Sequence, residues 1–526
     1  MSLSAQVPHA IGQQSPNSVA SSFSLEKEPM KSEKPRKPKA TRQIHARLRN
    51  YLRKIARKMP FIGSKFKKEE RHSPALSTTS TDESEDERIW WGDVRDIDDQ
   101  VLIDLAVKHL GVTHGLVCSV LERLEGSYNC AYVIQFSEGA KFVIRVPAAG
   151  RPGRWTQADA DALRSQVLTM AYIRRHTNLP IPDTLFFSTS LDIEGFGYPF
   201  IISQYLPGKQ LSEVWGTGID YDEDLERKRQ KILRSLAQTM SRLQYLSFPA
   251  SGSLYFQHNV DDNPQVGPRH MVDESSYPNR IPYYGTAYGD TPSHLRNRLD
   301  LWWEQTKTSV SYESNPFSPE AMEANGKYEI LKMAIDSLPL PDSGLLNERR
   351  QLIESFVLAP PDFDYQNILV DDDGNVTGLL DWDGVHTVPR FAGYAALPLW
   401  LTRDFTDAGW EWDGEIGNSD WDLARYRQCY AGYMYNAMEG QGDCRFTAKS
   451  HLFQLLQFGV EKENKMSWGA VRNFLNPILG RTDARAYVTK VGNEAYGWAR
   501  GEEGWLMERM EELFSCELGV EHGLYV

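Results

Sequence analysis

Apolar residues between positions 98 and 205 follow two kinds of spacing. Five stretches show the continuous or alternating apolar pattern of β-strands and are separated by polar turns. These stretches are 118–124, 131–136, 141–147, 184–188 and 198–205. Helical spacing predicts one helix that begins at Asp98 or Asp99 and a second helix over 157–176. The apolar stripe of the first helix consists of Val101, Leu102, Leu105 and Leu110.

Beyond Asp224 the spacing is mostly helical, although a turn-rich stretch over 248–295 interrupts it. A set of strands followed by a set of helices predicts an α+β fold with two lobes, a small antiparallel sheet lobe and a larger helical lobe. The predicted parts are a disordered basic tail (1–88), a sheet lobe (89–206) and a helical lobe (207–526).

The tail differs in charge from the rest of the chain. Residues 1–88 contain 18 Lys and Arg against 10 Asp and Glu, whereas the rest contains 40 against 61. The excess of acidic residues after position 88 argues against nucleic-acid binding, because binding to phosphate backbones requires a cationic surface. Within the tail, residues 41–59 have helical apolar spacing among seven Lys and Arg. We predict that the segment 41–68 binds an anionic membrane surface or an acidic protein partner, with a nuclear address or a disordered basic linker as the alternatives.

Three features bear on the cellular compartment. The five cysteines form no Cys-x-x-Cys pair, which disfavours disulfides and a zinc site. No apolar run approaches the roughly 18 to 20 residues that cross a bilayer. The first eight residues also lack the apolar region of a secretory signal. We therefore expect a monomeric, cytoplasmic protein.

The candidate chemistry is concentrated in the segment 359–384, which reads A-P-P-D-F-D-Y-Q-N-I-L-V-D-D-D-G-N-V-T-G-L-L-D-W-D-G. Asp362 precedes Asn367 by five residues on a loop that follows two prolines. Two apolar strands joined by a turn then lead to Asp381, so a hairpin would bring Asn367 and Asp381 to the same end. Phosphoryl transfer needs such groups, a carboxylate that accepts a hydroxyl proton and oxygen ligands for Mg²⁺. An acidic hairpin that faces water is the alternative.

This segment resembles the H-G-D-x-x-x-x-N and I-D-W-[DE] motifs of aminoglycoside phosphotransferases and related small-molecule kinases, especially their fungal branch. The V-P-R at 388–390 and the G-Y-A at 393–395 fit the same branch, and the resemblance covers roughly residues 115–435. It implies a protein-kinase-like fold that uses ATP and Mg²⁺ to phosphorylate a hydroxyl of a small-molecule substrate.

The resemblance also implies individual roles. By matching position, Asp362 would be the catalytic base, and Asn367 and Asp381 the ligands of Mg²⁺. Asp383 would help to fix the loop. Pro360 stands where relatives have a mainly architectural His.

The predicted nucleotide-binding residues are Gly126, Ser127, Tyr128, Asn129, Arg145, Gln166, Gln204 and Leu206. The first four form a turn whose backbone N–H groups would cradle phosphates, or which is only a hairpin turn. Arg145 and Gln166 stand where the family usually has a strand Lys and a helix Glu. Because Gln supplies no countercharge, we expect looser positioning of the nucleotide. The last two residues lie in a segment that resembles the hinge, whose backbone bonds adenine.

These features together predict an ATP- and Mg²⁺-dependent phosphotransferase, and the acidic body would suit a cationic acceptor. The alternative is a nucleotide-binding pseudokinase that acts through partner proteins. A protein kinase is disfavoured, because Asp-Trp-Asp replaces Asp-Phe-Gly at 381–383 and no Ala-Pro-Glu segment follows. We expect the aromatic pairs at 283–284 and 302–303 to lie in the core. If they are instead exposed in a cleft, they could form a stacking surface for the acceptor.

Overall fold

The computed structural model describes residues 89–110, 118–192, 195–216, 222–258, 260, 262–273, 281–339, 353–405, 418–461, 464–480, 483–493 and 500–516. The basic tail 1–88, with its segment 41–68, lies outside the described residues. The predictions made for the tail therefore stay predictions.

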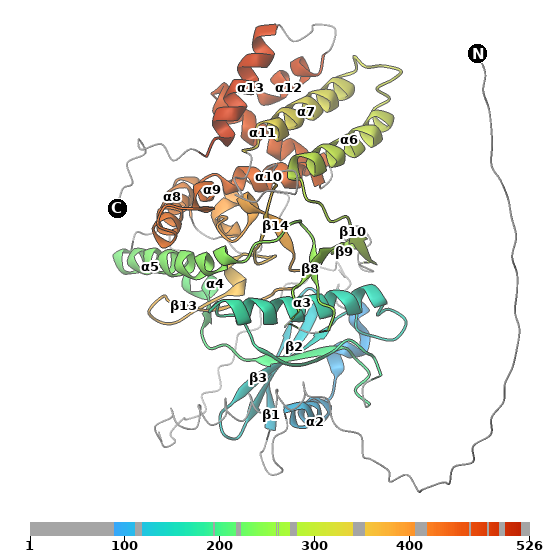
Figure 1. Ribbon diagram of the computed structural model, residues 1–526, viewed down its shortest axis with the longest axis vertical. Coiled ribbons are helices and arrows are strands. Elements are labelled where there is room, and N and C mark those ends of the chain that lie inside the picture. Colours follow the sequence, from blue (N-terminus) through green and yellow to red (C-terminus); the bar gives the residue numbers. More distant parts are fainter. Residues whose placement is uncertain are drawn as a thin grey trace, which may run out of the picture.

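The amino-terminal part of the described chain is a five-stranded antiparallel sheet with a helix on each face (Figure 1). Its strands, in the spatial order β1-β2-β3-β5-β4, are β1 (Cys118–Glu125), β2 (Asn129–Phe136), β3 (Lys141–Pro147), β5 (Phe200–Gln204) and β4 (Thr184–Ser188). The short 3-10 helix η1 (Ile89–Asp96) and the helices α2 (Asp99–Leu110) and α3 (Gln157–His176) accompany the sheet.

The alternation of side chains along β3 decides which residues face α3. Phe142 and Ile144 are buried in the core that the sheet shares with α2. Arg145 therefore lies on the opposite face. Its cross-strand partner is Ile201, which packs against Leu163 of α3. The strand period thus directs the Arg145 side chain toward the α3 face of the sheet.

The predicted strands and both predicted helices are present, and α3 has the predicted bounds. One detail was wrong. Val101 is 41% exposed, whereas Leu102 and Leu105 are buried. Consecutive residues are about 100° apart around a helix, so Val101 falls outside the face that Leu102 and Leu105 share.

The carboxyl-terminal part is mainly helical, so the expected α+β order of a small antiparallel sheet followed by a larger helical part is confirmed. Its helices are α4 (Leu211–Val214), α5 (Glu223–Met240), α6 (Thr291–Ser309), α7 (Pro319–Asp336), α8 (Asp420–Ala437), α9 (Cys444–Thr447), α10 (Ser450–Glu461), α11 (Asn464–Leu479), α12 (Ala484–Val491) and α13 (Arg500–Phe514). Its 3-10 helices are η2 (Ser241–Tyr245), η4 (Tyr365–Asn367), η5 (Arg390–Ala392) and η6 (Leu399–Phe405).

Short strands are also present in this part. They are β6 (Lys209–Gln210), β7 (Ser253–Tyr255), β8 (Gln265–Gly267), β9 (Arg269–Asp273), β10 (Ile281–Gly285), β11 (Phe356–Leu358), β12 (Ile368–Val370), β13 (Val376–Leu379) and β14 (Thr387–Pro389). The stretch 248–295, expected to consist of turns, thus contains the antiparallel pairs β7–β8 and β9–β10. These strands of three to five residues lie among many Pro, Gly, Ser, Asn and Asp residues, so the local composition indicates turns.

Two apolar cores lie in the carboxyl-terminal part. One joins α5 and α8 to the strands β11, β12 and β13, and it includes Met170 and Ile173 of α3. The other lies among α6, α7 and α10 to α13, at the end of the molecule farthest from the sheet (Figure 1). The first core is therefore the one that supports the segment 359–384.

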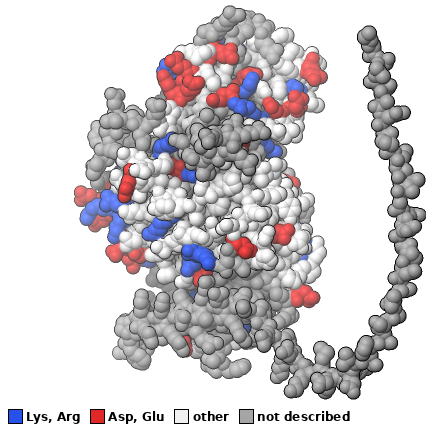
Figure 2. Space-filling model, in the orientation of Figure 1, with Lys and Arg blue, Asp and Glu red and all other residues white. Residues whose placement is uncertain are grey.

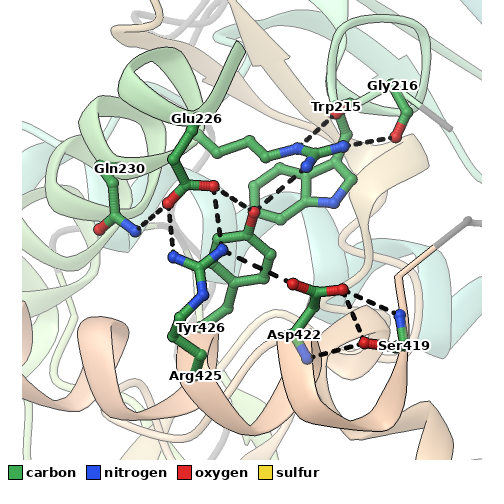
Figure 3. Close-up of polar contacts among 9 residues, drawn as sticks. Trp215, Gly216, Glu226, Gln230, Ser419, Asp422, Arg425 and Tyr426 are labelled. Atoms are coloured by element: carbon green, nitrogen blue, oxygen red, sulfur yellow. Dashed lines mark hydrogen bonds and ion pairs between the residues drawn. The ribbon is translucent and has the colours of Figure 1, made fainter. Parts of the chain in front are cut away.

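A polar cluster fastens α5 to α8 and to the end of α4 (Figure 3). The Glu226 carboxylate accepts hydrogen bonds from Arg425, from the Tyr426 hydroxyl at 2.6 Å and from Gln230 at 2.7 Å. Burial alone would raise the pKa of Glu226, but these hydrogen bonds outweigh it and lower the pKa to about 2. The neighbouring Arg229 donates to the carbonyl of Trp215 at 2.8 Å and so holds the chain that follows α4.

The described surface carries a mixture of charges (Figure 2). Acidic side chains gather over the helices at the end of the molecule farthest from the sheet, where the sequence of α13 contains five Glu. None of the helices in the described ranges is both long enough and apolar enough to cross a bilayer.

Candidate functional site

The hairpin of β12 and β13 brings the ends of the segment 359–384 together. Ile368 of β12 pairs with Leu379 of β13, and the Leu380 N–H donates to the Asn367 carbonyl at 2.7 Å. Asn367, just before β12, and Asp381, just after β13, therefore lie at the same end of the hairpin. The sequence predicted this juxtaposition, and the structure contains it.

Asp362 lies beside Asn367 on the loop after β11. One carboxylate oxygen of Asp362 accepts hydrogen bonds from the Asn367 amide at 2.8 Å and from the Gln366 amide at 3.0 Å. Burial raises the pKa of Asp362, and the two amide donors partly oppose this shift. The other carboxylate oxygen makes no hydrogen bond to the described residues. Asp362 is thus a carboxylate that two side-chain amides orient.

Asp364 anchors the loop that carries Asp362, although sequence reasoning did not single this residue out. Asp364 is fully buried, accepts from the Tyr365 N–H at 2.8 Å and pairs with Arg403 at 3.2 Å. The Arg403 guanidinium also covers the Tyr365 ring, 4.6 Å from its centroid. The D-F-D spacing by itself gave no sign of this burial, because residues two apart face the same side of an extended chain.

Asp381 occupies a backbone conformation that is rare for a residue with a side chain. Its φ is 52°, in the left-handed region that Asp tolerates better than most residues. The next residue, Trp382, is completely buried and donates its ring N–H to the Leu379 carbonyl at 3.2 Å. Burial of Trp382 therefore holds the sharp bend that directs the Asp381 carboxylate toward β3.

Arg145 reaches Asp381 across the boundary between the sheet and the helical part, at 3.2 Å. Burial and the negative charge of Asp383 raise the pKa of Asp381 to about 6, although Arg145 opposes the shift. The charge of Asp362 contributes in the same direction as that of Asp383. The carboxylates at 362, 381 and 383 are therefore close enough to repel one another, with Arg145 as a counterion.

Asp383 is the residue on which three of the predicted nucleotide-binding residues converge. Its carboxylate accepts from Asn129 at 2.6 Å, from Gln166 at 2.5 Å and from both terminal nitrogens of Arg145 at 3.1 Å. The sequence predicted only that Asp383 helps to fix the loop. The countercharge that Gln166 cannot supply to Arg145 thus comes from Asp383, two residues after Asp381. Arg145 therefore has a carboxylate partner, and the looser positioning of the nucleotide stays a prediction.

The other predicted nucleotide residues have different partners. The turn of Gly126, Ser127 and Tyr128 is exposed, and the Gly126 N–H donates to the Asn129 carbonyl at 2.9 Å. Gln204 ends β5 and donates its N–H to the Asp183 carbonyl at 2.9 Å. The half-buried Leu206 lies close to Gly378, since a Cβ added at Gly378 would come within 2.9 Å of the Leu206 side chain.

The two aromatic pairs differ in burial. Tyr283 and Tyr284 are 44% and 48% exposed, so they do not belong to a core. Trp302 and Trp303 are half-buried, and the Trp303 ring stacks on Tyr328 of α7 with the ring centroids 5.1 Å apart.

Comparison with known proteins gives distant similarities. No family model matches the chain. The curated relatives include altered inheritance of mitochondria protein 9, mitochondrial, from Saccharomyces cerevisiae (strain ATCC 204508 / S288c), which is 23% identical over 328 residues, 54% of this chain and 51% of the relative. The protein of the same name from Vanderwaltozyma polyspora is 24% identical over 336 residues, 55% of this chain and 52% of the relative. The chain spans about half the length of these relatives.

The resemblance to aminoglycoside phosphotransferases and small-molecule kinases also has counterparts among solved structures. A putative aminoglycoside phosphotransferase from Ralstonia eutropha JMP134 is 15% identical with a TM-score of 0.38, over 78% of this chain and 98% of that one. The macrolide 2'-phosphotransferase MphH from Brachybacterium faecium is 16% identical with a TM-score of 0.33, over 75% and 98%. At these TM-scores the likeness carries no argument about function.

The relatives overturn one expectation. We expected a cytoplasmic protein from the cysteines and the polar first residues, whereas the curated relatives are named as mitochondrial proteins. The expectation of a cytoplasmic location is therefore wrong. A signal was present in the sequence, since residues 41–59 contain seven Lys and Arg and no Asp or Glu. An amphipathic, Arg-rich and acid-poor segment is typical of mitochondrial targeting sequences.

Proposed function

We propose that this protein is a phosphotransferase that moves the γ-phosphoryl group of ATP to a hydroxyl of a small-molecule acceptor, with Mg²⁺ as cofactor. One observation carries the proposal. Asp362, Asn367 and Asp381 come together at one end of the β12–β13 hairpin, and Arg145 of the sheet reaches the same place. The motif resemblance supports the small-molecule acceptor.

The residues at this place fit a magnesium ion. The Asp381 carboxylate and the Asn367 side-chain carbonyl are oxygen donors, the type that Mg²⁺ prefers over nitrogen or sulfur. These two residues would hold the ion, which when bound supplies positive charge to the phosphates of ATP. Arg145 adds a fixed guanidinium, and the Asp383 carboxylate keeps it oriented at 3.1 Å.

Asp362 would orient the acceptor hydroxyl and take its proton. The two amide donors leave one carboxylate oxygen for this contact and fix the plane of the carboxylate. Because burial raises the pKa of Asp362, the ionised carboxylate is a somewhat stronger base than an exposed Asp. Positioning of this kind is the main contribution that a protein makes to phosphoryl transfer.

The proposal is tested by comparing the wild type with Asp362→Asn. We expect the wild type to bind ATP only with Mg²⁺, and to transfer labelled phosphate from ATP to members of a pool of hydroxyl metabolites. Asp362→Asn should retain ATP binding within about threefold and lose transfer by at least about a hundredfold. Asp373→Asn, in the exposed turn at the far end of the same hairpin, is the matched control and should behave as the wild type.

Two results would contradict the proposal in different ways. A wild type that does not bind Mg-ATP has no nucleotide site of this kind. Metal-dependent ATP binding without transfer, unchanged in Asp362→Asn, would favour the pseudokinase that acts through partner proteins.

We also infer a mitochondrial location, supported by the names of the relatives and by the acid-free basic segment 41–59. The full chain with a fluorescent carboxyl-terminal tag should co-localise with a mitochondrial marker. Replacing Arg42, Arg47 and Arg49 by Glu should redistribute it to the cytosol, whereas the same replacement by Lys should not. A cytosolic full chain would contradict the inference.

A further inference from the structure

Helix α3 is bonded on one side to a segment of the helical part. The buried Ser165 hydroxyl donates to the Leu254 carbonyl at 2.9 Å. Four residues earlier, Asp161 accepts from the Tyr284 hydroxyl at 2.9 Å. Residues four apart lie on the same face of a helix, so both bonds hold one face of α3. We call the segment that supplies the partners, residues 248–258 and 281–288, the brace.

Apolar packing extends this contact along α3. The Tyr172 ring lies 6.3 Å from that of Phe248 and 6.0 Å from that of Phe256, measured between ring centroids. Phe248 and Phe256 belong to the brace and are both buried. Strands β7 and β10 contact α3, and Figure 1 shows β10 near this helix. The brace therefore supports α3 over about three turns, from Asp161 to Tyr172.

The other side of the brace is bonded to the strands that carry the site. Phe248 and Phe356 of β11 exchange two backbone hydrogen bonds of 2.8 Å. Gly252 and Thr387 of β14 also exchange two backbone hydrogen bonds, of 3.3 and 2.8 Å, and the Thr387 hydroxyl donates to the Ala250 carbonyl at 2.7 Å. Strand β11 ends four residues before Asp362, and β14 begins four residues after Asp383. The brace thus spans the distance between α3 and the base of the candidate site.

These contacts form a ring of bonded residues that begins and ends at Asp383. From Asp383 the chain runs to Thr387, which is bonded to the brace. The brace is bonded to Ser165, and the adjacent Gln166 donates back to Asp383 at 2.5 Å. We propose that the brace is a positioning element that fixes α3, and through Gln166 the Asp383–Arg145 pair, in the arrangement that binds nucleotide. The proposal rests on the phosphotransferase function proposed above and names the part of the fold that sets its nucleotide affinity.

The physical reason is preorganisation. Gln166 is a neutral donor, so its bond to Asp383 is weaker than an ion pair and depends on the position of the helix that carries it. An independently mobile α3 would have to be ordered when nucleotide binds, at a cost in affinity. Because the brace is bonded both to α3 and to the strands that carry the site, α3 is already ordered before nucleotide binds. Tyr284 and Ser165 are therefore positioning residues, and neither touches the candidate ligand sites.

The brace is tested with Ser165→Ala and Tyr284→Phe, which each remove one hydroxyl from it. Tyr283→Phe is the matched control, because Tyr283 is exposed, adjacent in sequence and on the opposite face of β10. We expect each brace variant to weaken Mg-ATP binding about threefold to tenfold by calorimetry. In a Gln166→Ala background the same substitutions should have almost no further effect, because they act through Gln166.

Hydrogen exchange of the nucleotide-free protein provides a readout that does not depend on ATP. Amides of 157–176 should exchange faster in the brace variants and unchanged in Tyr283→Phe. Wild-type exchange and wild-type affinity in both brace variants would overturn the proposal, as would additive losses in the Gln166→Ala background. A wild type that binds no Mg-ATP would instead refute the proposed function, and faster exchange of α3 in the brace variants would still show that the brace holds the helix.

Discussion

Replacement of Asp383 by Asn is the sharpest test of how this site holds its arginine. The substitution keeps the size of the side chain but removes the negative charge that faces Arg145. The amide group of Asn also points an N–H toward at least one of the donors that now bond to the carboxylate, Asn129 and Gln166. Among the described residues, Arg145 would keep Asp381 as its carboxylate partner, which is the proposed metal ligand.

The expected magnitude follows from these contacts. A hydrogen bond to a charged group contributes about 1.5–3 kcal/mol. The Asp383 side chain is 33% exposed and that of Arg145 21%, so solvent weakens the pair. The amide oxygen of Asn still accepts a bond from one donor. We therefore expect a net loss of about 2–3 kcal/mol in Mg-ATP binding, or roughly a 30- to 150-fold higher dissociation constant.

Calorimetric titration of Mg-ATP measures this effect, and far-UV circular dichroism checks that the variant is folded. Asp372→Asn is the control, since Asp372 is 87% exposed and its ion pair with Lys209 lies outside the candidate site. Mg-ATP affinity within about twofold of the wild type in a folded Asp383→Asn variant would refute the reasoning, because the carboxylate would then be dispensable for holding Arg145.

Three further predictions follow from particular residues. Burial and the charge of Asp383 raise the pKa of Asp381 to about 6, and only the ionised carboxylate binds Mg²⁺. Mg-ATP affinity should therefore fall as the pH drops below about 6. Asp383→Asn should move the midpoint of this pH dependence to lower pH in the same titrations. Gly326→Ala would drive a Cβ into the Val488 backbone carbonyl of α12, so it should lower the free energy of unfolding in urea by roughly 3 kcal/mol. Gly504 lies in α13 with open space around it, so Gly504→Ala should raise the free energy of unfolding by about 0.5–1 kcal/mol. Asp364→Asn removes the buried charge that faces Arg403 and should cost about 3 kcal/mol of unfolding free energy, and a midpoint equal to that of the wild type would contradict this role.

Local patterns were sufficient for most of the sheet and for the hairpin that carries Asn367 and Asp381. Strand and helix periods are set by the backbone, so they appear in the sequence wherever an element is long enough. The short strands of the brace were missed because they lie among the Pro, Gly, Ser, Asn and Asp residues of the stretch 248–295, a composition that is typical of turns. Val101 was misplaced because an apolar residue at the edge of a stripe gives no sign of which side faces the core.

The sequence by itself determined the order of the elements and the residue types at the candidate site, since both are encoded in spacing and in the segment 359–384. It could not determine which donors meet Asp383. Asn129, Arg145 and Gln166 come from two strands and a helix more than two hundred residues away in the chain, and only packing of the sheet against the helical part brings them together. Local spacing does not encode such distances, so the partner that balances Arg145 was decided by the tertiary structure.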